Sequence, residues 1–95
     1  MSLTIAAMPA YNEERSITEM VLGCQKYVNH VVVVDDGSTD ATAEQAASAG
    51  AQVIHHEWNA GYGAALRTCF ETAQEMGADR MEIIDSDGQH SLTKT

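Results

Sequence analysis

The sequence predicts an α/β fold in three layers, with helices on both faces of a mainly parallel β-sheet. Short apolar runs alternate with segments whose apolar residues recur at helical spacing, in the order β-α-β-α-β-α-β. The connections are short, which favours parallel strands joined by right-handed helical crossovers. One run, "VVVVDD", begins with four consecutive valines without polar alternation, as expected of a strand covered on both faces.

The first strand and helix are predicted from an apolar run followed by a helical pattern. Residues 3–8 form the run, and Pro9 is expected to end the strand. Apolar residues then recur from 17 to 28 on one face of a helix. The segment Ser16 to Glu19 fits a capping box, and Asn12 is the alternative N-cap.

A second strand and helix follow. Residues 30–36 contain the continuous β-branched run and predict a central strand. Asp40 is expected to cap a helix from about 41 to 49, and Gly50 is expected to end it.

The rest of the chain repeats the alternation. Residues 51–56 predict a third strand, and apolar residues at helical spacing predict a helix within 61–76, closed by Gly77. Residues 80–85 predict a fourth strand.

The loops after these strands carry nearly all of the unusual polar residues. They read "PAYNE", "DDGSTD", "HHEWNAGYG" and "DSDGQH". Because ligands bind at the carboxyl ends of the strands in open parallel sheets, we expect a binding site there.

Composition limits the partners and the location. The 95 residues suffice for one small domain, and 14 acidic against 5 basic residues give a net charge of −9. This charge argues against nucleic acid or an anionic membrane surface as the main partner. The N-terminal segment lacks the features of a signal peptide, and Cys24 and Cys69 lie in apolar helical patterns, so we expect a cytoplasmic protein with reduced thiols.

Asp85 and Asp87, followed by Gly88, resemble a metal-binding turn at a strand end. Two carboxylates at this spacing suit a hard cation such as Mg²⁺ or Mn²⁺. An acidic surface turn is the alternative, since Asp, Ser and Gly are ordinary turn residues. His90 could add a ligand, or it could be a solvated loop residue.

Other candidates also have structural explanations. Asp35 and Asp36 end the most apolar strand, where a carboxylate can accept hydrogen bonds from a base or ribose or can simply be solvated. The segment 61–63 opens a helix whose N–H groups can approach a phosphate, and Arg67 follows one turn later. The cluster of His55, His56 and Trp58 is interpreted as strand-end and loop residues, without metal-ligand spacing.

Four stretches together resemble family 2 glycosyltransferases, most closely the branch of dolichol- or polyprenyl-phosphate mannose synthases. They are "MPAYNEERSI" (8–17), "VVVVDDGSTDATAEQAASAG" (31–50), "NAGYGAALRTCFETAQEMGAD" (59–79) and "IIDSDGQH" (83–90), in the family's order. The resemblance implies a GT-A fold with strand order 3-2-1-4, and a nucleotide-diphosphate sugar, GDP- or UDP-linked, as donor.

The resemblance also implies roles for individual residues. Pro9, Tyr11 and Glu13 would line the nucleoside pocket, and Asp36 would contact the base or ribose. Arg67 would face the donor phosphates. Asp85 and Asp87 would be the family's metal-binding pair, joined by Gln89.

The family normally continues beyond "DGQH" into an acceptor half, whereas this chain ends in "SLTKT". We therefore expect residues 1–95 to be a single partial domain, the donor-binding half of a GT-A transferase, truncated after the fourth strand. Catalytic residues are not assigned, and a lipid-phosphate acceptor would act only in a full-length relative, peripheral to a membrane. An open sheet edge predicts a homo-oligomer. The alternative is a non-catalytic nucleotide-binding or assembly module that kept the half-fold.

Overall fold

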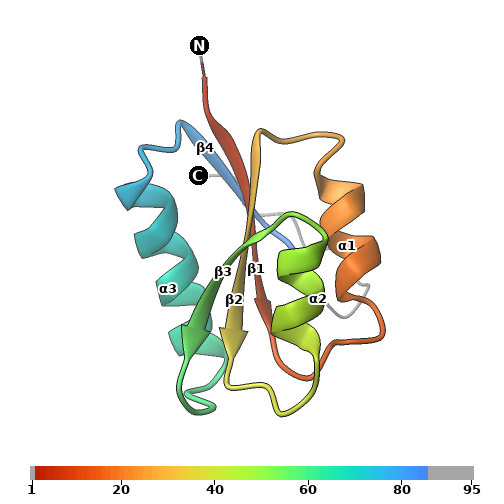
Figure 1. The fold of residues 1–95 in the computed structure, drawn as a ribbon. Coiled ribbons are helices and arrows are strands. Elements are labelled where there is room, and N and C mark those ends of the chain that lie inside the picture. Colours follow the sequence, from red (N-terminus) through yellow and green to blue (C-terminus); the bar gives the residue numbers. More distant parts are fainter. Residues whose placement is uncertain (1, 86–95) are drawn as a thin grey trace.

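The protein folds into three layers, α/β/α, in a computed structural model that describes residues 2–85 (Figure 1). The elements in chain order are β1 (Thr4–Ala10), α1 (Ile17–Cys24), β2 (His30–Asp36), α2 (Thr42–Ser48), β3 (Gln52–His56), α3 (Tyr62–Glu75) and β4 (Arg80–Ile83). All seven elements expected from the sequence are present, within a few residues of the expected bounds.

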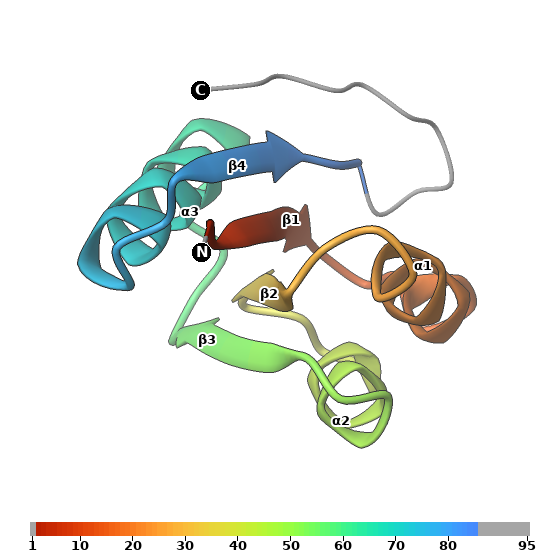
Figure 2. The same ribbon diagram turned by 90° about the horizontal axis from the view of Figure 1, so that it is seen from above.

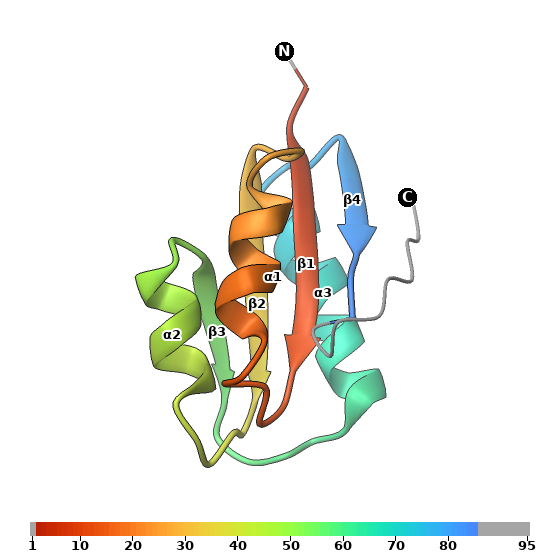
Figure 3. The same cartoon turned by 90° about the vertical axis from the view of Figure 1, so that its right-hand side faces the viewer.

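The four strands form one parallel sheet in the order β3-β2-β1-β4. The strand order implied by the family resemblance is therefore confirmed. Because the strands run the same way, their carboxyl ends lie toward one end of the molecule (Figure 3). The loops that follow the strands are brought together at that end.

The side chains of β2 alternate between two cores. Figure 2 shows α1 and α2 on one face of the sheet and α3 on the other. Val31 and Val33 pack in the cluster that includes α1 and α2, whereas Val32 and Val34 pack in the cluster that includes α3. All four are at most 3% exposed. Burying each valine contributes about 1.5–3 kcal/mol by transfer from water, so this run anchors both layers.

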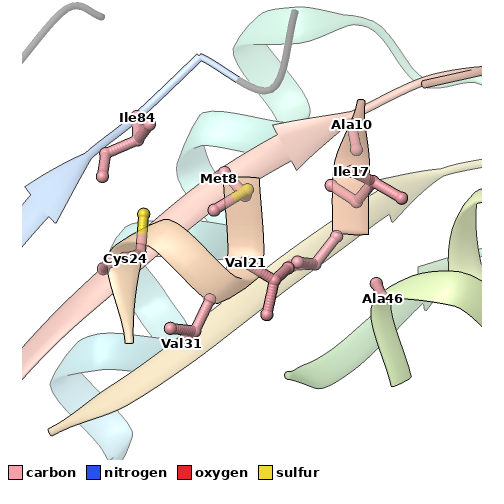
Figure 4. Close-up of a cluster of buried hydrophobic side chains, with 10 residues drawn as sticks. Met8, Ala10, Ile17, Val21, Cys24, Val31, Ala46 and Ile84 are labelled. Atoms are coloured by element: carbon pink, nitrogen blue, oxygen red, sulfur yellow. The ribbon is translucent and has the colours of Figure 1, made fainter. Parts of the chain in front are cut away.

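The core under α1 uses the helical face that the sequence predicts. Ile17, Val21 and Cys24 of α1 pack against Met8 and Val31 of the sheet (Figure 4). Ala46 from α2 joins the same cluster, as does Ile84, which follows β4.

The core under α3 is built from small residues on the helix. Ala65, Cys69 and Ala73 face the sheet and are at most 4% exposed. Both thiols of the chain, Cys24 and Cys69, are free and buried, and burial raises the pKa of Cys69 to about 12.

Pro9 does not end the first strand, contrary to expectation. It pairs with Val34 in the β1–β2 register, and the strand continues to Ala10. Ala7 accepts a hydrogen bond from Ile84 N–H, so its carbonyl faces β4. By strand alternation the nitrogen of Pro9 faces the same way, beyond the last paired residue of β4, and its missing N–H costs no bond to β2.

The predicted helix caps are only partly correct. Ser16 occupies the N-cap position of α1, but it makes no side-chain capping bond, so the capping box with Glu19 does not form. The N-cap position of α2 is Ala41 and not Asp40, but Asp40, one residue earlier, accepts the backbone N–H of Thr42 on its Oδ1 at 2.9 Å. Gly50 closes α2 with a φ of 107°, a conformation that favours glycine.

At the β4 edge of the sheet, the apolar side chains are buried rather than exposed. Met81, Ile83 and Ile84 are 2%, 5% and 5% exposed, whereas the polar side chains of β4, Arg80 and Glu82, reach the surface. Beside them lies a groove of about 630 Å³ between α1 and β4, lined by apolar residues such as Met20 and Tyr27 together with Glu82. Within residues 2–85, no helix is long and apolar enough to cross a bilayer.

Candidate functional site

A pocket of about 290 Å³ lies at the carboxyl ends of β1, β2 and β4 and is called here the carboxyl-end pocket. It is lined by Pro9, Ala10, Tyr11, Glu13, Asp36, Asn59, Gly61, Tyr62, Ala65 and Asp85. The parallel sheet places these residues together, although they come from segments far apart in the sequence.

Five of the residues selected from the sequence meet in this pocket: Pro9, Tyr11, Glu13, Asp36 and Asp85. The other two proposed metal ligands, Asp87 and Gln89, lie outside the described residues, as does His90. Half of the ten lining residues were thus candidates from the sequence, and the roles expected of them stay predictions.

The β1–α1 loop is fixed by side chains from the β2–α2 loop. Asn12 N–H donates to Ser38 Oγ at 2.9 Å, and Asn12 Oδ1 accepts Thr39 N–H at 2.9 Å. Asn12 has a φ of 51°, a left-handed conformation that asparagine tolerates better than most residues. This pairing holds the backbone beside Tyr11, whose ring is 44% exposed at the pocket.

The acidic pair after Asn12 is also anchored to the start of α2. Glu13 N–H donates to Thr42 Oγ1 at 2.8 Å, which places the Glu13 carboxylate at the pocket. Glu14 N–H donates to Asp40 at 3.3 Å, and the Glu14 carboxylate accepts Ala41 N–H at 3.0 Å. The two glutamates therefore differ in role, because Glu14 is occupied in joining two loops.

Asp36 holds the loop between β3 and α3. Its Oδ1 accepts Ala60 N–H (2.9 Å) and a bond from His56 Nδ1 (2.8 Å), and its Oδ2 accepts Gly61 N–H (2.9 Å). Burial favours the neutral acid, but these hydrogen bonds outweigh burial and lower the pKa of Asp36. An ionised carboxylate has about four acceptor positions, so about one remains for a ligand.

Asp85 faces the pocket from the end of β4 and accepts a hydrogen bond from Tyr62 Oη at 3.1 Å. The carboxylate oxygens of Asp85 are suitable ligands for a hard divalent cation such as Mg²⁺ or Mn²⁺. Within residues 2–85 there is no cluster of three or more potential His, Cys, Asp or Glu ligands. A complete shell would therefore need donors from a bound ligand, from solvent, or from Asp87 and Gln89.

Arg67 does not line the carboxyl-end pocket. It lines another cavity, of about 380 Å³, together with His55, Trp58 and Thr68. The structure therefore does not bring Arg67 together with the other candidate residues, and its expected role at donor phosphates stays a prediction.

Sequence reasoning missed three residues of the site. Asn59 and Tyr62 line the pocket, and His56, which does not line it, forms a hydrogen bond with Asp36. The glycine-flanked segment 61–63 drew attention to the helix N-terminus, but nothing in the spacing showed that Tyr62 would reach Asp85. That contact depends on the distance between α3 and β4 in space.

The sequence profile of a family described as "Glycosyl transferase family 2" matches residues 5–93, nearly the whole chain. The chain belongs to glycosyl transferase family 2. This glycosyltransferase chain has the GT-A fold, in agreement with its parallel sheet and strand order.

Two relatives of this glycosyltransferase chain have names that state an activity. The chain is 34% identical over 102 residues to the UDP-N-acetylglucosamine–dolichyl-phosphate N-acetylglucosaminyltransferase of Methanococcus voltae. This alignment covers 88% of the chain and 41% of the relative. The chain is also 32% identical over 99 residues to the polyprenol monophosphomannose synthase of Mycolicibacterium smegmatis, in an alignment that covers 93% of the chain and 36% of the relative. The chain thus spans well under half of the length of these relatives.

Solved structures show the same fold. Glucosyl-3-phosphoglycerate synthase from Mycobacterium tuberculosis, in complex with Mn²⁺, UDP and glucosyl-3-phosphoglycerate, superposes with a TM-score of 0.74 at 28% identity. The match covers 90% of this chain and 33% of the synthase chain. The synthase has also been solved with Mg²⁺ and UDP.

Proposed function

We propose that the carboxyl-end pocket binds the nucleotide diphosphate of a GDP- or UDP-linked sugar. The observation that carries the proposal is the convergence of Tyr11, Glu13, Asp36 and Asp85 at one end of the parallel sheet. The exposed Tyr11 ring offers a surface on which a base can stack, and the carboxylates can accept hydrogen bonds from a base or ribose.

The charge of the pocket implies that a divalent cation accompanies the ligand. Glu13, Asp36 and Asp85 are acidic, and no Lys or Arg is among the described residues that line the pocket. A diphosphate alone would be repelled there, because like charges at close range in a partly buried site are unfavourable. Neutralisation by Mg²⁺ or Mn²⁺ removes this obstacle.

We propose that Asp85, Asp87 and Gln89 hold this cation. When bound, the ion would supply Lewis-acid stabilisation of the departing diphosphate. Tyr62 would orient the Asp85 carboxylate through its 3.1 Å hydrogen bond, and Glu13 and Asp36 would position the nucleoside.

For a full-length protein we propose hexosyl transfer from this donor to a polyprenyl or dolichyl phosphate, or to another acceptor. The names of the M. voltae and M. smegmatis relatives support lipid-phosphate acceptors. Residues 1–95 would then be the donor-binding half, at the cytoplasmic side and peripheral to the membrane that holds the acceptor.

Isothermal titration calorimetry with UDP and GDP, in Mn²⁺ or in EDTA, tests the proposal. We expect binding that requires the metal and that weakens in Asp85→Asn. Glu71→Gln is the matched control, because it removes one negative charge from an exposed position of α3 outside the pocket. Equal affinity in EDTA and in Mn²⁺ would contradict the metal role, and the absence of binding to either nucleotide would leave only a non-catalytic assembly module.

A further inference from the structure

We propose that His56, which does not line the carboxyl-end pocket, positions one wall of that pocket by holding the Asp36 carboxylate. The inference rests on the proposed nucleotide-binding function and assigns a positioning residue for it. The wall consists of residues 59–61, of which Asn59 and Gly61 line the pocket.

The path of this wall depends on the orientation of one carboxylate. Asp36 accepts the N–H groups of both Ala60 and Gly61, one on each oxygen. Rotation of the Asp36 side chain would break both bonds together, because its two oxygens turn as one rigid group. Residues 59–61 therefore keep their position only while the Asp36 carboxylate keeps its orientation.

His56 fixes that orientation through a chain of hydrogen bonds to α3. Nδ1 lies 2.8 Å from Asp36 Oδ1, and Nε2 lies 2.9 Å from Thr68 Oγ1. Thr68 Oγ1 in turn lies 3.1 Å from the Ala64 carbonyl oxygen, so the imidazole is held between the end of β2 and the first turns of α3. The His56 side chain is only 19% exposed, which limits competition from water.

Each possible arrangement of protons on His56 and Thr68 preserves the hydrogen bond between His56 and Asp36. An ionised carboxylate only accepts hydrogen bonds, so Nδ1 of His56 must carry a proton and donate it. If the Thr68 hydroxyl donates to Ala64, Nε2 is also protonated. If the hydroxyl turns toward Nε2, the ring is neutral. In both arrangements the Nδ1–H group points at Asp36.

The wall also has little room to adjust. A Cβ atom at Gly37 would lie 2.5 Å from the Trp58 carbonyl carbon and 2.6 Å from the Asn59 nitrogen, so the loop packs directly on the residue after Asp36. The backbone at Gly37 has a φ of 75°, which favours glycine. The loop cannot compensate for a turned carboxylate by moving closer to β2.

Variants at His56 separate this role from general packing. His56→Asn places its amide nitrogen close to the position of Nδ1 and retains a donor to Asp36. His56→Gln places its amide nitrogen toward Thr68, and His56→Leu, a match in shape to asparagine, donates to neither. His30→Leu is the control, because His30 contacts Gln52 at the amino end of β2, away from the pocket.

The 95-residue chain is titrated with UDP in Mn²⁺, and the amide resonances of Ala60 and Gly61 are recorded without ligand. We expect His56→Leu and His56→Gln to bind UDP about tenfold more weakly, the effect of losing a hydrogen bond to a charged group. We expect His56→Asn and His30→Leu to keep affinity within about threefold of the unsubstituted chain. In His56→Leu and His56→Gln, the two amide protons should shift upfield and exchange faster with solvent.

Unchanged amide resonances in His56→Leu or His56→Gln would overturn the inference, as would a His56→Asn variant as weak as His56→Leu. If His56→Leu does not fold, the comparison of His56→Asn with His56→Gln decides, because both are polar. If the unsubstituted chain does not bind UDP, the proposed function fails. The amide measurements, which need no ligand, then still decide whether His56 holds the wall.

Discussion

Replacement of Asp36 by Asn should destabilise the fold far more than the same change at Asp35. Both carboxylates lie at the end of β2, and they are 4% and 5% exposed. Asp36 accepts three hydrogen bonds from the protein, and all three donors belong to the β3–α3 segment. Asp35 accepts one backbone N–H, from Ser38 at 3.1 Å, and lies 3.5 Å from the exposed His55.

The expected magnitude follows from these partners. Asparagine keeps one acceptor oxygen but turns an NH₂ group toward donors on its other side. At Asp36 this change removes at least one charged hydrogen bond and leaves a buried donor unpaired, each contributing about 1.5–3 kcal/mol. We expect a loss of about 3 kcal/mol in the free energy of unfolding for Asp36→Asn, and about 1 kcal/mol or less for Asp35→Asn, whose oxygen can still accept Ser38 N–H.

Urea denaturation followed by circular dichroism measures both variants against the unsubstituted chain. A loss of about 3 kcal/mol is a large share of the roughly 5–15 kcal/mol typical of a domain, so the transition midpoint should fall clearly. Equal losses in the two variants would refute the reasoning, because burial and charge are matched and only the number of partners differs.

Four further predictions concern pH, metal, catalysis and assembly. The pKa of Asp36 is lower in the folded chain than in the unfolded chain, where it is near 3.8. The stability that the ionised Asp36 contributes is therefore complete above pH 3.8 and is lost as pH falls through the folded pKa. Stability should fall less steeply with acid in Asp36→Asn, and identical pH profiles of the two chains would disprove this. Asp87→Asn should weaken Mn²⁺-dependent UDP binding by more than about 1 kcal/mol in calorimetry, whereas unchanged affinity would exclude Asp87 as a ligand. The purified chain, which spans 41% of the M. voltae transferase, should not transfer labelled sugar efficiently to a lipid phosphate, and robust transfer would show the opposite. The open backbone of β4 should promote self-association, and a monomeric mass by light scattering at high concentration in physiological salt would contradict it.

The structure retains only part of the surface that the sequence predicted for self-association. The apolar side chains of β4 are buried, so they offer no exposed apolar edge. What remains is the outer backbone edge of β4, a strand that pairs only with β1 among residues 2–85, and the adjacent groove between α1 and β4. Repulsion from the net charge of −9 is screened beyond about 8 Å at physiological salt, whereas backbone pairing acts at contact.

The sequence by itself determined the order and type of the elements. The run from Val31 to Val34 indicated a strand covered on both faces, because its residues are β-branched and no position in it is polar. The helical spacing of Ile17, Val21 and Cys24 identified the face of α1 that the structure buries. These patterns are local, since each depends on the period of one element and on which side of it meets water.

Only the tertiary structure decided what the polar residues do. Ser16 and Glu19 have the spacing of a capping box, yet that box does not form. The loop before α1 is held instead by a bond from Glu13 N–H to Thr42 Oγ1 and by a bond that the Glu14 carboxylate accepts from Ala41 N–H. Hydrogen-bond partners of this kind are far apart in the chain, and their spacing in sequence carries no information about the distance between them.

The same reason explains the site. The parallel sheet determined that Tyr11, Asp36 and Asp85 would share one end of the molecule, because strands that run the same way end on the same side. Which cavity Arg67 lines, and which donors meet Asp36, depended on the packing of the β3–α3 loop against Gly37 and of α3 against the sheet. Side chains can be assigned to an end of the sheet from the order of the strands, but their contacts are set by packing in three dimensions.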